Sequence, residues 1–288
     1  MKELIGTGTA LITPFKTDYS IDFNALEAIV NHQINNGTDY FVVLGTTGES
    51  ATLNKDEKRQ VIECIKTANA GRLPLVLGIG GNDTARVHDD FQSTDLDGFC
   101  AILSVSPYYN KPNQEGIYRH YETLAKDSPL PIIIYNVPGR TGSNMTAETQ
   151  LRLAQLPNIV ATKEASGNLE QVMKIISQKP EDFLVISGDD ALTLPMIAAG
   201  ASGVISVINH AYPKLFSEMV RSGLKGDISA ARNLHYQTME GAIEIFADGS
   251  PGGIKVMLNE MGLCETTVRP PLYGVNAQVD QKLRSLVK

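Results

Sequence analysis

Short apolar runs alternate with amphipathic stretches along most of this chain. Eight of these runs consist almost wholly of apolar and small residues, which is typical of parallel strands buried on both faces. They are Gly8–Pro14, Tyr40–Leu44, Leu75–Ile79, Phe99–Val105, Ile132–Tyr135, Asn158–Lys163, Phe183–Ile186 and Gly203–Val207. Each is followed by a stretch with helical periodicity, and several of these begin at a capping residue such as Asp22 or Asn54.

Eight strand-then-helix units in succession, with no linker between them, predict a (β/α)8 barrel, also called a TIM barrel. The units end near Ser222. We therefore expect a catalytic barrel over residues 1–225 and a helical extension packed on it over residues 226–288. Helices are predicted in that extension at 230–246, 253–261 and 279–287, where the helical period continues.

Composition narrows the range of partners. The 288 residues carry a formal net charge of −7 and are 42% hydrophobic and 20% charged. This acidic balance argues against nucleic acid or an anionic membrane as partner. The start of the chain does not read as a secretory signal, and no apolar stretch approaches ~18 residues. The three cysteines show no CxxC spacing, so we expect a reducing, cytoplasmic location.

Lys163 is the most informative single residue. It ends the sixth apolar run, where burial disfavours the ammonium form and lowers the pKa of the side chain. A neutral lysine amine can attack a carbonyl carbon and form a Schiff base. The alternative is a lysine whose stem is buried and whose charge reaches solvent at the strand end, and Lys163 by itself does not decide between the two.

In a (β/α)8 barrel, active sites lie at the carboxyl ends of the strands, so polar residues that follow other strands become candidates. The second strand leads into Gly45-Thr46-Thr47-Gly48-Glu49-Ser50, whose hydroxyl and N–H groups can hold a small anion. The alternative is a turn that only begins a helix. Tyr108 and Tyr109 follow the fourth strand, where tyrosines serve packing more often than catalysis.

The fifth and seventh strands end in further candidates. Tyr135 can carry a proton, and Arg140 can bind a carboxylate bidentately. Asp189 and Asp190 follow the seventh strand, where helix capping is favoured over a metal site because no histidine or third carboxylate stands at ligand spacing. The five histidines also never stand four residues apart, so no metal site is predicted.

Five sequence blocks at strand ends, in order, carry a family resemblance over essentially the whole chain. They are Gly45–Leu53, Pro107–Pro112, Tyr135–Gly142, Lys163–Asn168 and Ser187–Asp190. With these blocks the chain resembles the pyruvate-dependent class I lyases and aldolases, and within them the dihydrodipicolinate synthase family. The resemblance implies a condensation of pyruvate with aspartate β-semialdehyde in lysine and diaminopimelate biosynthesis.

The resemblance implies roles for four catalytic residues. Lys163 would condense with pyruvate, and the imine would act as an electron sink, so that the pyruvate methyl group loses a proton and becomes an enamine. Tyr135 would carry that proton, in a hydrogen-bonded relay with Thr46 and Tyr109. The Tyr109 equivalent reaches into a neighbouring subunit in the family, which implies a homo-oligomer, a tetramer built as a dimer of dimers.

The resemblance also implies the binding residues. Thr47 would hold the pyruvate carboxylate, and Arg140 would bind the carboxylate of the second substrate, aspartate β-semialdehyde. Gly188 and Ile205 would line the pocket. No organic cofactor or metal is implied, because the imine itself supplies the electron sink.

Two other functions stay open on sequence grounds. One is a lyase of the same mechanism that acts on another aldehyde or a sugar acid, as N-acetylneuraminate lyases do. The other is a non-catalytic barrel that senses a keto acid. Thr46, Tyr109 and Arg140 together favour the synthase.

A possible allosteric pocket for lysine is implied as well. Its matching residues are Ser50, Ala51, Asn82 and Tyr108. Members that lysine strongly inhibits carry two histidines and a glutamate where this chain has Lys55, Lys58 and Arg86. Since three added cations repel the lysine ammonium, we expect weak or absent inhibition by lysine.

Overall fold

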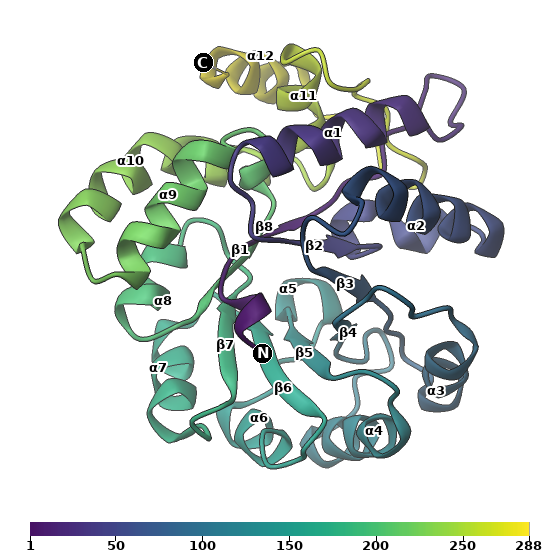
Figure 1. Ribbon diagram of the computed structural model, residues 1–288, viewed down its shortest axis with the longest axis vertical. Helices are drawn as coiled ribbons and strands as arrows, with labels where there is room; N and C mark the ends of the chain where they lie inside the picture. Colours follow the sequence, from purple (N-terminus) through teal and green to yellow (C-terminus); the bar gives the residue numbers. More distant parts are fainter. Residues whose placement is uncertain (288) are drawn as a thin grey trace.

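The structure, a computed structural model, describes residues 1–287 and contains one closed barrel of parallel strands (Figure 1). The strands are β1 (Gly6–Ala10), β2 (Tyr40–Val43), β3 (Leu75–Gly78), β4 (Ala101–Val105), β5 (Ile132–Asn136), β6 (Ile159–Glu164), β7 (Leu184–Ser187) and β8 (Gly203–Ser206). They pair in chain order, and β8 closes against β1. The predicted (β/α)8 barrel is therefore confirmed.

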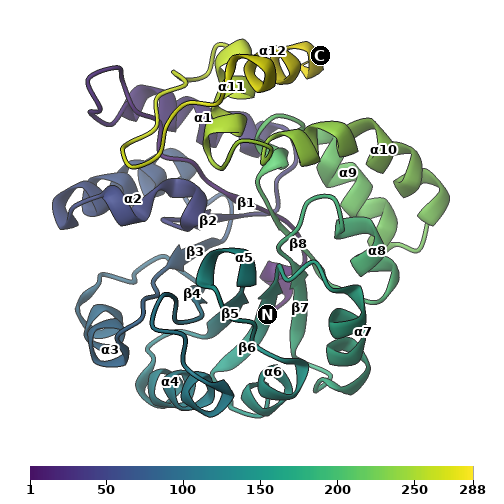
Figure 2. The same cartoon turned by 180° about the vertical axis from the view of Figure 1, so that it is seen from behind.

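Helices surround the barrel on its outer side, as Figures 1 and 2 show from opposite directions. The α-helices are α1 (Phe23–Asn35), α2 (Lys55–Asn69), α3 (Thr84–Ser93), α4 (Gln114–Asp127), α5 (Pro138–Thr141), α6 (Ala147–Leu153), α7 (Leu169–Gln178), α8 (Thr193–Ala198), α9 (Pro213–Leu224), α10 (Ile228–Glu244), α11 (Gly252–Glu260) and α12 (Ala277–Leu286). The short 3-10 helices are η1 (Lys2–Leu4), η2 (Thr46–Gly48), η3 (Ser50–Thr52) and η4 (Ile208–His210).

Helix starts agree with the sequence signals. Asn54 caps α2 in a complete capping box, in which its side chain accepts from the Glu57 N–H and the Glu57 carboxylate accepts from the Asn54 N–H. Asp22 caps α1 through the N–H of Ala25. Strand limits agree less well, since β1 begins at Gly6 and ends at Ala10, whereas the apolar run continues to Pro14. The apolar run outlasts the strand because residues 11–15 remain buried.

The seam between β1 and β8 requires glycine. Gly203 has φ +144°, and a Cβ atom there would lie 2.0 Å from the carbonyl oxygen of Gly6. No other residue fits this approach.

Apolar side chains fill both sides of the strand wall. Inside the barrel, residues two apart along a strand share the inward face, and this interior cluster includes Val42, Ile133, Tyr135, Ala161 and Ile205. A larger cluster joins α1, α2 and α9 to α10–α12, and a third packs the outer face under α3, α4, α6 and α7. The carboxyl ends of the strands therefore stand on a densely packed support.

Residues 226–287, here called the C-terminal segment, contain the three helices α10, α11 and α12. In both views α11 and α12 lie beside α1, which comes from the opposite end of the chain (Figures 1 and 2). The phenol of Tyr212 donates a hydrogen bond to the carbonyl of Leu286 at 2.7 Å, which fixes the end of α12 to the barrel. Across residues 1–287, no helix is both long enough and apolar enough to cross a membrane.

Candidate active site

Lys163 and Tyr135 stand side by side on neighbouring strands. They are register partners across β5 and β6. Lys163 lies two residues beyond the inward-facing Ala161 and therefore also points into the barrel. The lysine is 6% exposed, and its Nζ lies 4.4 Å from the centroid of the Tyr135 ring. The side chain is thus buried beside the phenol, and the alternative of an ammonium group reaching solvent is not what the structure shows.

Burial lowers the pKa of Lys163 from 10.5 to about 8. The carboxylate of Asp190 acts in the opposite direction, and the guanidinium of Arg140 lowers this pKa further. An amine with a pKa near 8 is partly neutral at physiological pH, which is the form that attacks a carbonyl carbon.

The phenol of Tyr135 stays protonated at neutral pH. Its burial raises the pKa to about 12, while Arg140 and a hydrogen bond with Thr46 act in the opposite direction. Arg140 itself is exposed and lies in α5, directly after β5. The structure therefore brings Thr46, Tyr135, Arg140 and Lys163 together.

The two threonines lie in the turn over residues 45–53, which consists of η2 and η3. Thr46 is exposed and Thr47 is 7% exposed. The turn leads directly to Asn54, the N-cap of α2. It therefore does begin a helix, as the alternative interpretation of this segment expected. The same turn places Thr46 beside Tyr135.

Gly188 leaves the space that Lys163 occupies. A Cβ atom at Gly188 would lie 3.0 Å from the Cε and 3.1 Å from the Cγ of Lys163, and 2.7 Å from the Cβ of Ala165. Its N–H donates to the carbonyl of Glu164 at 2.8 Å. Ile205 is 1% exposed and belongs to the same interior cluster as Tyr135.

Tyr109 is the one proposed catalytic residue that the single chain does not bring to the others. It is 88% exposed and has φ +72°, a conformation that residues with a side chain rarely adopt. Its phenol makes no hydrogen bond within residues 1–287. A large exposed aromatic side chain in a disfavoured backbone conformation is typical of a residue that acts on a partner.

The residues of the possible allosteric pocket form two pairs. The side-chain amide of Asn82 donates to the carbonyl of Tyr108 at 3.1 Å. Ser50 and Ala51 lie in η3. Within the described part of the chain, no hydrogen bond joins the first pair to the second.

Asp190 was expected to cap a helix, but its carboxylate binds backbone groups at the end of a neighbouring strand instead. Its neighbour Asp189 does accept from the N–H of Leu192, just before α8, at 3.1 Å. The Asp190 carboxylate instead accepts from the N–H groups of Val207 at 3.1 Å and Ile208 at 2.9 Å, where β8 ends. Burial raises the pKa of Asp190 to about 6, and its charge acts on Lys163. The sequence indicated the acidic pair as a candidate but did not indicate that Asp190 would bind the backbone of Val207 and Ile208.

A second group that sequence reasoning missed surrounds Glu164, the residue after Lys163. Glu164 is 1% exposed. Its carboxylate accepts from Gln150 Nε2 at 2.7 Å, from Asn136 Nδ2 at 3.0 Å and from the N–H of Ser166 at 2.8 Å. Asn136 is its register partner on β5. These bonds hold the ends of β5 and β6 in fixed relation, and only the adjacency of these residues to Tyr135 and Lys163 could have indicated them.

Residues 1–287 contain no group of three or more His, Cys, Asp or Glu side chains placed to hold a metal ion. The chemistry of the arrangement is that of a buried amine, a phenol and hydroxyl groups beside an exposed guanidinium. Such a set can form an imine with a keto acid and move protons to and from it.

Proteins of known function resemble this chain closely along its whole length. The 4-hydroxy-tetrahydrodipicolinate synthase of Flavobacterium psychrophilum is 56% identical over 289 residues, which cover 100% of this chain and 99% of that protein. The protein of the same name from Parabacteroides distasonis is 51% identical and covers 99% of this chain and 96% of its own length.

Solved structures agree with the fold. The dihydrodipicolinate synthase of Aquifex aeolicus superimposes with a TM-score of 0.94 at 40% identity, covering 98% of this chain and 97% of that one. The enzyme of the same name from Thermotoga maritima gives a TM-score of 0.95 at 36% identity, with coverage of 98% and 97%. The sequence model that describes the dihydrodipicolinate synthetase family matches residues 3–288 of this chain. With this match and these relatives, the chain belongs to the dihydrodipicolinate synthetase family.

Proposed function

We propose that this protein is a 4-hydroxy-tetrahydrodipicolinate synthase, a lyase that condenses pyruvate with L-aspartate 4-semialdehyde in lysine and diaminopimelate biosynthesis. The observation that carries the proposal is the buried Lys163, whose pKa is lowered to about 8 and whose Nζ lies 4.4 Å from the ring centroid of Tyr135. The names of the relatives reported above support the same reaction and do not favour a lyase for a sugar acid.

The first half of the reaction uses the residues inside the barrel. The neutral amine of Lys163 attacks the keto carbon of pyruvate, water leaves, and an iminium forms. The methyl group then loses a proton, and the electron pair of that C–H bond becomes the enamine double bond as the iminium charge is neutralised. Tyr135 carries protons in these steps, with Thr46 and the Tyr109 of a neighbouring subunit in the relay.

The second half joins the two substrates. The enamine carbon attacks the aldehyde carbon of the semialdehyde, which forms the new C–C bond and regenerates the iminium. The π electrons of the aldehyde C=O bond move to its oxygen, which takes a proton and becomes a hydroxyl group. The amine of the semialdehyde then attacks the iminium carbon, displaces Lys163 and closes the ring. In this scheme Thr47 holds the pyruvate carboxylate, and Arg140 holds the carboxylate of the semialdehyde. Gly188 and Ile205 shape the pocket.

Assembly and location are parts of the same proposal. The exposed Tyr109 supports a homo-oligomer in which one subunit completes the site of another, and we propose a tetramer built as a dimer of dimers. Three free cysteines support a reducing cytoplasm. Residues 226–288 are proposed to be an extension of the barrel domain, since α10 continues directly from α9.

A coupled assay tests the function. Pyruvate and aspartate semialdehyde are supplied with an excess of dihydrodipicolinate reductase, and NADPH consumption is followed. Turnover that needs both substrates is expected. Reduction by borohydride in the presence of pyruvate should leave a pyruvyl adduct on Lys163. An adduct without turnover would support imine formation and argue against the semialdehyde as substrate. If neither the adduct nor turnover is observed, the protein would be a binding protein without this catalytic activity.

The Arg140→Ala variant tests the second substrate. Its kcat/KM for the semialdehyde should fall strongly, because the carboxylate partner is lost, while the pyruvyl adduct on Lys163 still forms. An unchanged kcat/KM would count against the proposed role of Arg140 and against the semialdehyde.

A further inference from the structure

The turn over residues 45–53 is bent in a way that its own sequence does not favour. Between η2 and η3, Glu49 has φ +50° and ψ +34°, in the left-handed region that residues with a side chain rarely adopt. The hydroxyl of Thr13 donates a hydrogen bond to the carbonyl of Gly48 at 2.7 Å. Since Thr46 and Thr47 stand on this turn, whatever fixes Glu49 also fixes them.

Glu49 is held by the opposite end of the chain. Its side chain and that of Lys255 are both 0% exposed, and the Glu49 Oε1 lies 2.6 Å from the Lys255 Nζ. The other carboxylate oxygen accepts from the backbone N–H of Arg269 at 2.9 Å. The Lys255 ammonium also donates to the carbonyl of Thr267 at 2.8 Å and lies 4.4 Å from the ring centroid of Phe15. Both charges are therefore paired and bonded, as buried charges must be.

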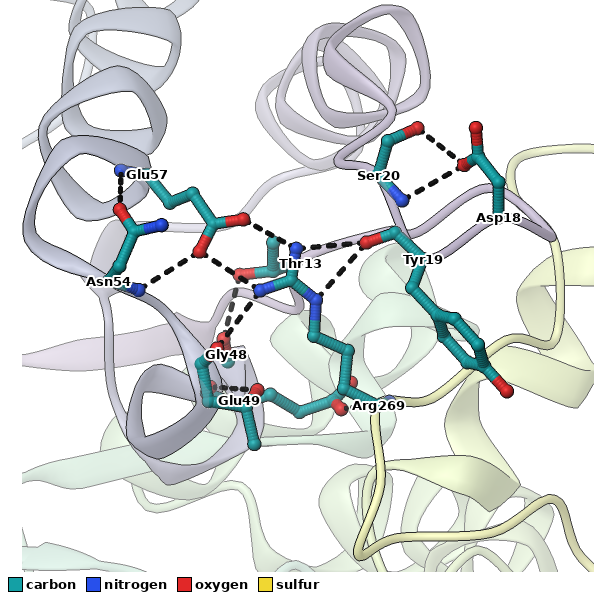
Figure 3. Close-up of polar contacts among 10 residues, drawn as sticks. Thr13, Asp18, Tyr19, Ser20, Gly48, Glu49, Asn54, Glu57 and Arg269 are labelled. Atoms are coloured by element: carbon teal, nitrogen blue, oxygen red, sulfur yellow. Dashed lines mark hydrogen bonds and ion pairs between the residues drawn. The ribbon is translucent and has the colours of Figure 1, made fainter.

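The side chain of Arg269 also binds the end of this turn and the start of α2 (Figure 3). Its Nη1 donates to the carbonyl of Thr52 at 2.9 Å and to Glu57 Oε2 at 3.0 Å, and its Nη2 donates to Glu57 Oε1 at 2.6 Å. Two further bonds reach the carbonyl of Tyr19. The guanidinium thus joins the end of η3, the first turn of α2 and the loop before α1.

We propose that Glu49, Lys255 and Arg269 are positioning residues for the reaction. Through them the C-terminal segment sets where Thr46 and Thr47 stand. The inference rests on the proposed function, from which it takes the roles of the two threonines. The physical reason is that a buried ion pair with satisfied hydrogen bonds has one arrangement, whereas a loosened turn in a disfavoured backbone conformation has several.

The Glu49→Gln variant tests the proposal with little change in shape. Lys255 and the Arg269 N–H bind different carboxylate oxygens, and the amide keeps an oxygen at only one of these two positions, so residue 49 loses one of its two side-chain partners. We expect kcat/KM for pyruvate to fall about 10- to 100-fold, because small misplacements of binding and catalytic groups have effects of that size. KM for pyruvate should rise through Thr47, and kcat should fall through Thr46. The constants are measured well below the midpoint of thermal unfolding of the variant.

The Arg284→Met variant is the matched control. Arg284 also lies in the C-terminal segment and pairs with Glu260 and Asp280, each at 2.9 Å, but it does not contact the turn. It should lower the midpoint of unfolding and leave both kinetic constants unchanged. If Glu49→Gln lowers only that midpoint and keeps the wild-type KM and kcat, the pair serves stability alone and the proposal is overturned.

The Arg269→Met variant keeps the test open if Glu49→Gln does not fold. It retains the backbone N–H that binds Glu49 and removes the contacts to Thr52 and Glu57. A smaller rise in KM for pyruvate is expected, and wild-type constants in this variant would also contradict the proposal.

Trapping with borohydride separates this inference from the proposed function. Reduction on Lys163 needs pyruvate alone, so the rate of adduct formation in Glu49→Gln can be compared with wild type even if the semialdehyde is not the second substrate. A slower rate in the variant supports the inference, and an equal rate overturns it. A wild-type protein that forms no adduct would refute the function and the inference together.

Discussion

The pH dependence of imine formation on Lys163 is the most direct consequence of its burial. The pKa falls from 10.5 to about 8 because the ammonium form loses its hydration inside the barrel. This lowering corresponds to roughly 3 kcal/mol of preference for the neutral amine. At pH 7 about a tenth of the lysines would be neutral, against about 3 in 10,000 for an unperturbed side chain.

The two cases differ most above pH 8. A buried lysine should give a rate of pyruvate imine formation that rises tenfold per pH unit up to about pH 8 and then levels off. An ordinary lysine should give a rate that continues to rise to about pH 10. Tyr135 does not add a second step in this range, because burial raises its pKa to about 12.

The assay is a single-turnover experiment without the semialdehyde. Protein and pyruvate are mixed between pH 6.5 and 9.5, samples are quenched with excess borohydride at set times, and the adduct on Lys163 is counted by mass spectrometry. Two variants provide internal controls of opposite sign. Removing the cation in Arg140→Gln should move the midpoint of the profile to higher pH, and removing the anion in Asp190→Asn should move it to lower pH. A rate that still climbs tenfold per unit beyond pH 9 would refute the reasoning.

Three further predictions follow from the same geometry. Gly188→Ala should lower kcat/KM at least ~10-fold and also lower the midpoint of thermal unfolding, because the added Cβ would lie 2.7 Å from the Cβ of Ala165 and 3.0 Å from the Cε of Lys163. Wild-type activity in this variant would show that the lysine can move aside. Lys163→Met should raise the free energy of unfolding at pH 7 by up to roughly 3 kcal/mol, because the pKa of the wild-type lysine is lowered on folding and the lysine therefore opposes folding below pH 8. Denaturant unfolding should show this gain in stability vanish as the pH rises from 8 towards 10.5, and a gain that does not depend on pH would contradict the prediction. Lysine should inhibit turnover weakly or not at all because of Lys55, Lys58 and Arg86, and half-maximal inhibition at sub-millimolar lysine would refute this.

The barrel and the identity of its central lysine could be predicted from sequence because both depend on local patterns. Each strand is a short apolar run, and chain order alone fixes the neighbours in a (β/α)8 barrel. Tyr135 and Lys163 therefore had to be adjacent once their strands were recognised, and the register confirms it. Strand limits were less accurate. The apolar run predicts a strand from Phe99 to Val105, whereas β4 begins at Ala101, because the buried run of residues starts before the strand does.

Long-range polar partners were beyond the reach of sequence. Glu49 and Lys255 are 206 residues apart in the chain, and neither differs in its local pattern from a charged residue on a surface. The partners of Asp190 on the next strand end, Val207 and Ile208, are backbone groups, which no side-chain motif reveals. Such pairs depend on which elements the completed barrel brings together, so only a structure could identify them.

Lys163 and Lys255, both buried, show how the same burial leads to different chemistry. Burial lowers the pKa of Lys255 as it does that of Lys163. The charge of Glu49 opposes that effect at Lys255, where the two side chains form an ion pair at 2.6 Å. Lys163 has no ion pair with a carboxylate of residues 1–287, and Asp190 acts on it only through its charge.

The neighbours of each lysine therefore decide its role. At Lys255 the ammonium form is bonded on several sides, and the side chain is suited to hold a turn in place. At Lys163 the side chain is buried without a bonded carboxylate among residues 1–287, and burial favours the free amine. Exchanging the environments, for example by placing a carboxylate within bonding distance of Lys163, would keep the lysine charged and remove its nucleophilic form at neutral pH.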